Sequence, residues 1–165
     1  MKILLVAAEA APFIKTGGLG DVIGALPKSL KQDATTETRV ILPYYKKIAE
    51  KYEAQAEDVF WTFINVGWRH QYVGIKKIEV EGTVFYFVDN ADYFGGRDEV
   101  YGYDDDGERF AFFQLAVAEV IERLDFVPDI LHVNDYHTAL LPFLSKEKYK
   151  WIQAVSQIKT VLTIH

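Results

Sequence analysis

The sequence predicts an α/β fold, a Rossmann-like three-layer sandwich with a mainly parallel sheet and an antiparallel ribbon inserted into it. Two observations support this prediction. Apolar strand-like segments alternate with helix-like segments at both ends of the chain, whereas residues from about 59 to 88 show the pattern of an antiparallel ribbon. With 165 residues, half of them apolar, the chain is long enough for one domain with a substantial core.

The first strand is expected from about Lys2 to Ala8, in the centre of the sheet, and the first helix from Gly20 to about Lys31. The loop between them has glycine at positions 17, 18 and 20. Backbone N–H groups of such a loop can approach an anion without a Cβ in the way, and the helix directs its positive dipole end at the same point. Lys15 adds a charge that no helix or core contact is expected to need. The loop is therefore predicted to bind phosphate.

Two familiar phosphate-binding motifs do not fit this loop. A Walker loop has glycines five apart followed directly by Lys and Ser or Thr, whereas here the lysine precedes the glycines. The dinucleotide fingerprint needs its third glycine one residue before Gly24. It also needs an acidic residue after the next strand, which is expected at Arg39–Leu42 and ends at Pro43. An oxidoreductase with a nicotinamide cofactor is therefore only a minor alternative.

The ribbon and the helix after it follow from local patterns. Glu81-Gly82 is expected as a tight turn between strands at Ile78–Val80 and Val84–Val88. Asp105, with Glu108 three residues later, matches an Asp variant of the capping box at a helix start. This acidic cluster lacks the alternating spacing of an EF-hand loop, so a structural role is favoured over metal binding. The expected buried face of the helix comprises Phe110, Phe113, Val117, Val120, Ile121 and Leu124.

Polar side chains follow the last two expected strands. The segment Ile130–Asn134 is expected to be a buried strand that delivers Asp135 and His137 into a loop opening another helix. His165 follows a strand at Thr160–Ile164. Ligands of open α/β sheets bind outside the carboxyl ends of the strands, so these side chains and the glycine loop are predicted to converge at one edge. For Asp135 alone, a helix cap or a solvated turn explains the position equally well.

The remaining histidines are expected to be structural. His132 lies within a strand, where a histidine is usually a core group, and His70 is expected at the surface. A zinc site of His132, Asp135 and His137 would lack both the helical i, i+4 pair and the cysteines that complete such sites. The chain has no cysteine, so it has neither a disulfide framework nor a thiolate metal site.

Residues 15–22, Lys-Thr-Gly-Gly-Leu-Gly-Asp-Val, match letter for letter the amino-terminal signature of the bacterial glycogen synthase and plant starch synthase family. The chain resembles this family over nearly its whole length. Beyond the signature, the resemblance extends through ordered blocks at Ile23–Pro27, Tyr101–Tyr103, Glu108–Phe113, His132–Thr138 and Thr163–His165.

The resemblance implies a retaining glycosyltransferase that moves glucose from ADP-glucose, or a related nucleotide sugar, to the nonreducing end of an α-1,4-glucan such as glycogen or starch. Family members have two Rossmann-like domains that close over a cleft, the GT-B arrangement. Residues 1–165 resemble only part of the amino-terminal domain, so the carboxyl-terminal domain of the same protein is an expected partner. The chemistry needs no metal or cofactor in this family, so none is expected. The isolated chain is expected to be inactive.

The resemblance also implies roles for individual residues. Lys15, with the backbone of Gly17 and Gly18, is expected to stabilise the charge on the departing diphosphate. His165 corresponds to the histidine of the catalytic pocket that holds the transferred glucose. Asp135 corresponds to the acid of a family motif near the sugar.

Four further side chains are carried over from the family. His137 is expected near the sugar and acceptor, Asp21 on the nucleotide side, Glu9 in the pocket wall and Tyr101 by the acceptor channel. Two function classes stay open: a glycogen or starch synthase, and a noncatalytic nucleotide-sugar or glucan-binding module on the same fold. The choice between ADP-glucose and UDP-glucose also stays open, because the base is expected to lie against the second domain.

Charge and targeting patterns narrow the partners and location. The formal net charge of −6, without a basic stripe, argues against nucleic acid and is compatible with a neutral polysaccharide. Only six apolar residues precede Glu9, so the first ten residues are expected to be mature protein and not a secretory signal. No apolar stretch has the length of a membrane span. A bacterial cytoplasm is therefore expected, or a plastid if a leader has been removed.

Overall fold

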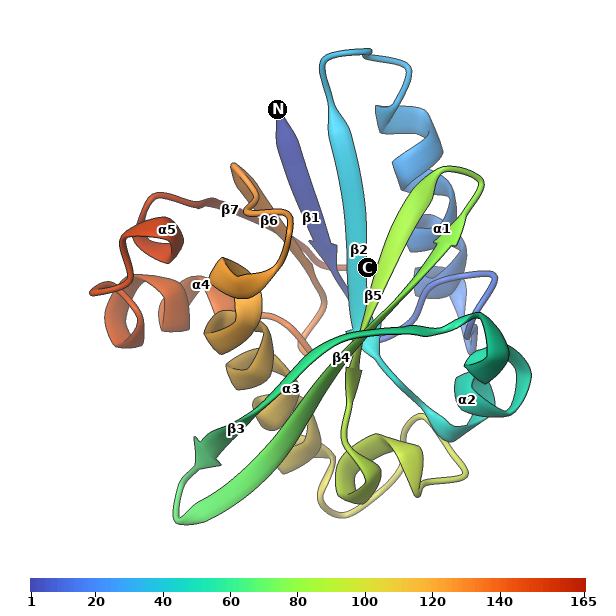
Figure 1. Ribbon diagram of the computed structural model, residues 1–165, viewed down its shortest axis with the longest axis vertical. Helices are drawn as coiled ribbons and strands as arrows, with labels where there is room; N and C mark the ends of the chain where they lie inside the picture. Colours follow the sequence, from blue (N-terminus) through green and yellow to red (C-terminus); the bar gives the residue numbers. More distant parts are fainter.

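The computed structural model describes residues 1–165 as one twisted sheet of seven strands between two layers of helices (Figure 1). The strand order is β3-β4-β5-β2-β1-β6-β7. Neighbours from β5 to β7 are parallel, and β3, β4 and β5 pair antiparallel. The strands are β1 (Lys2–Val6), β2 (Glu37–Pro43), β3 (Glu57–Val66), β4 (Arg69–Val80), β5 (Thr83–Asp89), β6 (Ile130–Asn134) and β7 (Lys159–Thr163).

Strand β1 lies in the interior of the sheet, as the sequence predicts. It pairs in parallel with β2 on one side and with β6 on the other. Its four residues from Ile3 to Val6 are all buried, because helices cover both faces of the parallel part of the sheet. The strand ends at Val6, two residues before the expected Ala8.

The antiparallel ribbon is also confirmed, and it is continuous with the main sheet. Strand β5 pairs antiparallel with β4 and parallel with β2. Glu81 and Gly82 both have positive φ, 51° and 70°, as the two central residues of a tight type I′ hairpin turn require. A second turn, with Gly67 at φ 61°, joins β3 to β4.

Figure 1 shows α1 and α2 on one side of the sheet and α3, α4 and α5 on the other. Helix α1 begins at Gly18, two residues earlier than expected, and continues for three residues beyond Pro27. The helices are α1 (Gly18–Leu30), α2 (Lys46–Tyr52), α3 (Asp106–Val120), α4 (Leu141–Phe143) and α5 (Gln153–Ser156). Short 3₁₀ turns are η1 (Glu53–Gln55) and η3 (Ile121–Arg123), and π-helical turns are η2 (Ala91–Gly95) and η4 (Leu144–Lys148).

Helix α3 starts where the acidic cluster predicts, but the capping-box prediction is wrong. Asp105 occupies the N-cap position and its side chain accepts no backbone N–H of the helix. Its carboxylate instead accepts two hydrogen bonds from Arg97, at 2.7 and 3.1 Å. Glu108 pairs with Arg69 and accepts the hydroxyl of Tyr93. Charge-assisted bonds to arginine are stronger than a bond to a neutral amide, so the arginines take the carboxylates. All six residues of the expected apolar face are buried.

Candidate functional site

One open cleft of about 650 Å³ lies at the carboxyl ends of β1 and β6, beside the start of α1. It brings together seven of the nine residues that the sequence predicts for the site. The lining residues are Glu9, Gly17, Gly18, Leu19, Val22, Tyr101, Asp135, Tyr136, His137 and His165. The predicted convergence of the glycine loop with the polar ends of two strands is therefore found.

The glycines of the loop have different reasons to be glycine. A Cβ added to Gly17 or Gly18 would meet no protein atom within 4 Å, so the backbone there is open to an approaching ligand. A Cβ on Gly20 would lie 3.1 Å from the backbone of Lys15. On Gly24 it would lie 2.8 Å from the carbonyl oxygen of Ala11. The first pair thus lines the cleft, and the second pair allows α1 to pack closely against the preceding loop.

Lys15 and Asp21 are the two predicted site residues that do not line the cleft. Lys15 Nζ lies 2.7 Å from Asp21 Oδ2, and more than half of each side chain is exposed. Lys15 therefore contacts the first turn of α1 through Asp21. Exposed pairs of this kind are weak, so a more highly charged anion can compete for the lysine.

Glu9 fastens the glycine loop to the opposite wall of the cleft. Its carboxylate is buried and accepts the backbone N–H of Thr16, and it accepts the Thr16 hydroxyl at 3.0 Å. It also accepts the hydroxyl of Tyr101 at 3.1 Å. Burial, and then the charge of Glu9, raise the pKa of Tyr101 well above its usual range. Tyr101 is therefore a protonated donor, and Glu9 fixes the positions of two loops at once.

A buried arginine, Arg109, bonds to the loop that carries Tyr101. Its side chain donates to the carbonyl oxygens of Tyr93 at 2.7 Å and Val100 at 3.0 Å. It also contacts Asp106 at 2.6 Å, which partly offsets the cost of burying its charge. The position of Tyr101 thus depends on contacts across both ends of its loop.

His137 lies in the cleft wall as a neutral aromatic group. Its ring stacks on Tyr101 at 4.9 Å between centroids and meets the edge of Phe110 at 4.6 Å. Burial lowers its pKa to about 4, although the charges of Asp135 and Glu9 oppose this shift. Nδ1 has no hydrogen-bond partner. This nitrogen is buried, and a neutral imidazole does not supply positive charge to a phosphate.

Asp135 follows β6 in a left-handed conformation with φ 60°, which is unusual for a residue with a side chain. Its Oδ1 accepts the backbone N–H of His165 at 2.7 Å, and its own N–H donates to Thr163 at 2.9 Å. The Thr138 hydroxyl accepts the N–H of Asn134 and closes the turn. Residues 136–140 form turns, and the helical segment that the sequence predicts after this loop begins at Leu141 with α4 and continues through η4 to Lys148.

Asn134 is a site residue that the sequence reasoning missed. Its Nδ2 donates to the carbonyl oxygens of Val6 and His132, so Oδ1 must accept. Oδ1 lies 3.1 Å from Nε2 of His165, which therefore carries the proton and leaves Nδ1 free. The only sequence signal for Asn134 was its position as the polar residue that ends a buried strand. His132 has the expected structural role, since it bonds Thr163 Oγ1 at 2.8 Å.

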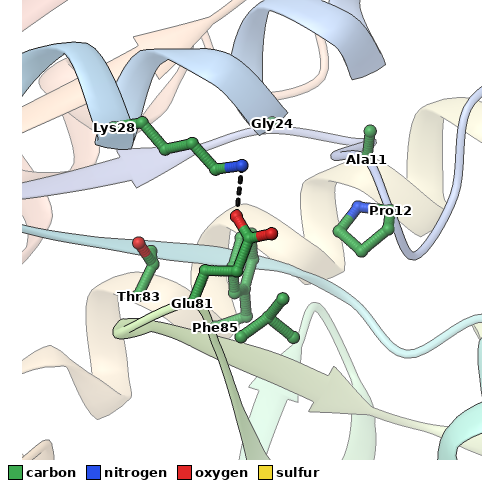
Figure 2. Close-up of a pocket in the computed structure, with 8 residues that line it drawn as sticks. Ala11, Pro12, Gly24, Lys28, Glu81, Thr83 and Phe85 are labelled. Carbon is green, nitrogen blue, oxygen red and sulfur yellow. Dashed lines mark ion pairs between the residues drawn. The ribbon is translucent and has the colours of Figure 1, made fainter.

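A second pocket, of about 220 Å³, lies between α1 and the turn that joins β4 to β5 (Figure 2). Lys28 and Glu81 form an ion pair across it. Ala11, Pro12 and Gly24 close the other side, where the loop packs on α1. No residue predicted for the site lines this pocket, and its charges neutralise each other. The larger cleft is therefore the better candidate.

The sheet, with a glycine loop at a helix start and polar groups at the strand ends, places the chain among the doubly wound α/β domains, whose ligands bind outside the carboxyl ends of the strands. The chain belongs to the starch synthase catalytic domain family, whose model matches residues 2–165. This confirms the family resemblance of the sequence blocks.

Known relatives are similar to this protein over the whole length of the chain. The glycogen synthases of Streptococcus pneumoniae (strain 70585) and Lactococcus lactis subsp. lactis are 65% and 59% identical to it over all of its residues. The structure is similar to the catalytic domain of starch synthase IV from Arabidopsis thaliana bound to ADP and acarbose, with a TM-score of 0.88, 28% identity and 99% of this chain covered. The chain spans about a third of the length of these relatives, 34%, 35% and 33% respectively. None of its helices combines the length and the apolar character needed to cross a membrane.

Proposed function

We propose that the whole protein is a retaining glucosyltransferase, which transfers glucose from ADP-glucose or a related nucleotide sugar to the nonreducing end of an α-1,4-glucan. Family membership along the whole chain supports the reaction class. The observation that carries the proposal is the cleft, in which an open glycine loop faces polar groups from the ends of two strands. We assign the diphosphate to the glycine loop and the sugar ring to the polar groups.

The diphosphate is proposed to lie at the start of α1. Gly17 and Gly18 have open space where a Cβ would lie, so an anion can approach the N–H groups and the positive dipole end at the start of α1. Lys15 is proposed to leave Asp21 and bind the diphosphate, because two negative charges attract it more strongly than one exposed carboxylate. These fixed donors stabilise the charge that develops on the leaving group as the glycosidic bond breaks. We propose that the reaction uses no metal or cofactor of the protein itself.

The transferred glucose is proposed to lie between Asp135, His137 and His165. His165 is oriented by Asn134 and by the Asp135 carboxylate, which leaves Nδ1 free to accept a sugar hydroxyl. His137 is neutral at pH 7 and lines the cleft, and because its Nδ1 is buried we propose that its ring packs beside the sugar. Tyr101 is proposed to line the acceptor side of the cleft through its ring, since Glu9 engages its hydroxyl. Asp21 is proposed to lie on the nucleotide side.

The rest of the protein is proposed to form a second domain that closes over this cleft and completes the donor site. The relatives, about three times longer than this chain, support this arrangement. A cytoplasmic location, with neither nucleic acid nor a membrane as partner, is part of the same proposal.

The proposal is tested by incubating the full-length protein with glycogen and radiolabelled ADP-glucose or UDP-glucose, and measuring label incorporated into the polymer. We expect label to be incorporated into glycogen with one of the two donors. Titration calorimetry with the same donors gives their affinities independently. Donor or glucan binding without any transfer would instead support the noncatalytic module.

A further inference from the structure

The outer face of the β3–β4 hairpin carries aromatic side chains that the core does not need. Trp61 is 63% exposed and Phe63 48%, although both belong to a regular strand. Tyr72, on the neighbouring strand, is 39% exposed. Large exposed aromatic groups gathered on one face are a common sign of a binding surface. These three residues, together with His70, are called the aromatic strip below.

The register of the two strands makes the strip continuous. Phe63 lies opposite Tyr72, and Trp61 lies opposite Gly74. The rings of Trp61 and Tyr72 are nearly parallel, 24° apart with centroids 6.5 Å apart. Phe63 stacks on His70 at 4.9 Å. Gly74 has no side chain, and the Tyr72 ring lies over it, where a Cβ would come within 2.7 Å of the Tyr72 hydroxyl oxygen.

Beside these rings lies an open groove of about 520 Å³ with polar groups along it. Besides Trp61 and Tyr72, it is lined by Asp58, Lys76 and Asp89. Lys76 is occupied, because it contacts Asp58 at 2.8 Å and Glu53 at 3.3 Å. No ion pair holds Asp89, and burial raises the pKa of its carboxyl. The groove therefore combines aromatic faces with carboxylate oxygens that can accept hydrogen bonds.

We propose that this groove binds a neutral carbohydrate chain. The C–H groups on the face of a pyranose ring carry slight positive charge and pack on the negative π face of an aromatic ring. The hydroxyl groups at the edge of the sugar donate to carboxylates such as those of Asp58 and Asp89. An anionic partner is disfavoured, because the one lysine of the groove is paired and the chain carries a net charge of −6.

The groove is separate from the candidate active site. It lies on β3 and β4 at one end of the strand order, and three strands separate β3 from β1. The choice of an α-1,4-glucan as the occupant rests on the proposed function, whereas the binding of a neutral sugar chain does not. A second contact would hold a polymer near the protein while the cleft works on a chain end.

The first test is hydroxyl-radical footprinting of the full-length protein with and without maltoheptaose, read by mass spectrometry of the peptides. Trp61, Phe63 and Tyr72 are expected to be oxidised in the free protein and protected by the sugar. Trp151, which is 74% exposed and lies between η4 and α5, serves as the internal control and should not change. Absence of oxidation at Trp61 in the free protein would show that the rest of the protein covers this face. Oxidation that maltoheptaose does not reduce would also overturn the proposal.

The second test uses variants of the full-length protein in affinity electrophoresis through gels that contain glycogen. Trp61→Ala is expected to weaken retention by about three- to tenfold, and Trp151→Ala to leave it unchanged. Asp89→Asn keeps every ring and is expected to weaken retention by a few fold, which separates lost sugar contacts from a disturbed hairpin. Glucose transfer to a short acceptor should be unchanged in Trp61→Ala. This measurement therefore distinguishes a failure of the proposed enzyme activity from a failure of the proposed groove. Wild-type retention in both groove variants would overturn the proposal. It would also be overturned if the protein formed an oligomer that Trp61→Ala dissociates and maltoheptaose does not, because the groove would then bind a second copy of the protein.

Discussion

The Tyr101 hydroxyl donates a 3.1 Å hydrogen bond to Oε1 of Glu9, and so joins two loops that lie 92 residues apart in the chain. Tyr101→Phe should destabilise the full-length protein by about 1 kcal/mol, because Glu9 keeps its bonds from Thr16. Glu9→Ala should cost about 2 to 3 kcal/mol, since it leaves the Thr16 N–H and the Tyr101 hydroxyl without an acceptor. Urea unfolding of both variants measures this difference. Equal losses of stability in the two variants would contradict the proposal that Glu9 links the two loops.

Lys15→Ala is expected to weaken donor binding and slow transfer. Loss of one charge-assisted contact to the diphosphate should reduce affinity or rate about ten- to a hundredfold, or roughly 1.5 to 3 kcal/mol. Folding should change little, because its pair with Asp21 is exposed. Lys28→Ala, which removes another exposed ion pair of α1, is the matched control and should keep wild-type donor kinetics. A well-folded Lys15→Ala enzyme with unchanged donor KM and kcat would remove Lys15 from the site.

Periodicity and turn chemistry predicted the parts of the fold that depend on neighbouring residues. The buried run after Lys2 became an interior parallel strand, and Glu81-Gly82 became a hairpin turn, because apolar burial and positive φ are set locally. The ordered motifs also placed the glycine loop, Asp135 and His165 in one cleft. Strand ends of a parallel sheet must meet at one edge, so this convergence needed no knowledge of side-chain contacts.

Pairings between side chains could not be predicted in this way. Asp105 had the right spacing for a capping box, but Arg97 lies close enough to take its carboxylate. Lys15 had the right place for a phosphate ligand, and its pairing with Asp21 depends on how the loop folds back over α1. Asn134 was missed because its function depends on which carbonyl oxygens surround its amide.

The left-handed backbone of Asp135 makes a prediction that is separate from its charge. Asp135→Gly should be about 1 kcal/mol more stable than Asp135→Ala, because glycine adopts φ 60° without a Cβ penalty. Both variants lose the carboxylate that accepts the N–H of His165. Thermal unfolding of the full-length proteins compares them directly. If alanine is as well tolerated as glycine, the turn after β6 does not hold this conformation.

His137 should make stability depend on pH in the acidic range. Its pKa is lowered to about 4 in the folded protein from the usual value of 6.5, so between these values the unfolded state binds more protons. Stability should therefore fall as the pH drops from 6.5 to 4. Because His137 is partly accessible to solvent, we expect the pKa shift to lower the free energy of unfolding by roughly 2 kcal/mol in total.

The matched variant for this prediction is His137→Gln, measured by urea unfolding at pH 7, 5.5 and 4.5. The difference in stability between wild type and variant should change across this range, with wild type losing more. A smaller slope should remain in the variant, because burial also lowers the pKa of His132. Parallel stability curves for wild type and His137→Gln would show that folding does not lower the pKa of His137.

Residues 1–165 expressed alone are expected not to transfer glucose, even where they fold. The cleft is open, and two of its lining residues, Val22 and Tyr136, are 39% and 64% exposed. Water in an open cleft screens the charge of Lys15 and the loop N–H groups, so the leaving diphosphate gains little stabilisation. Donor affinity should fall to the millimolar range or weaker, because the contacts proposed for the second domain are absent.

The measurement is label transfer from ADP-glucose to glycogen by the isolated chain, with the full-length protein in parallel. Circular dichroism of the isolated chain must first show a folded α/β domain, so that inactivity is not caused by unfolding. Adding the rest of the protein as a separate polypeptide is expected to restore part of the activity, since closure of the cleft would exclude water and bring further donors to the diphosphate. Transfer by the isolated chain at the full-length rate would show that this half of the cleft suffices, and the closed two-domain site would then not be needed.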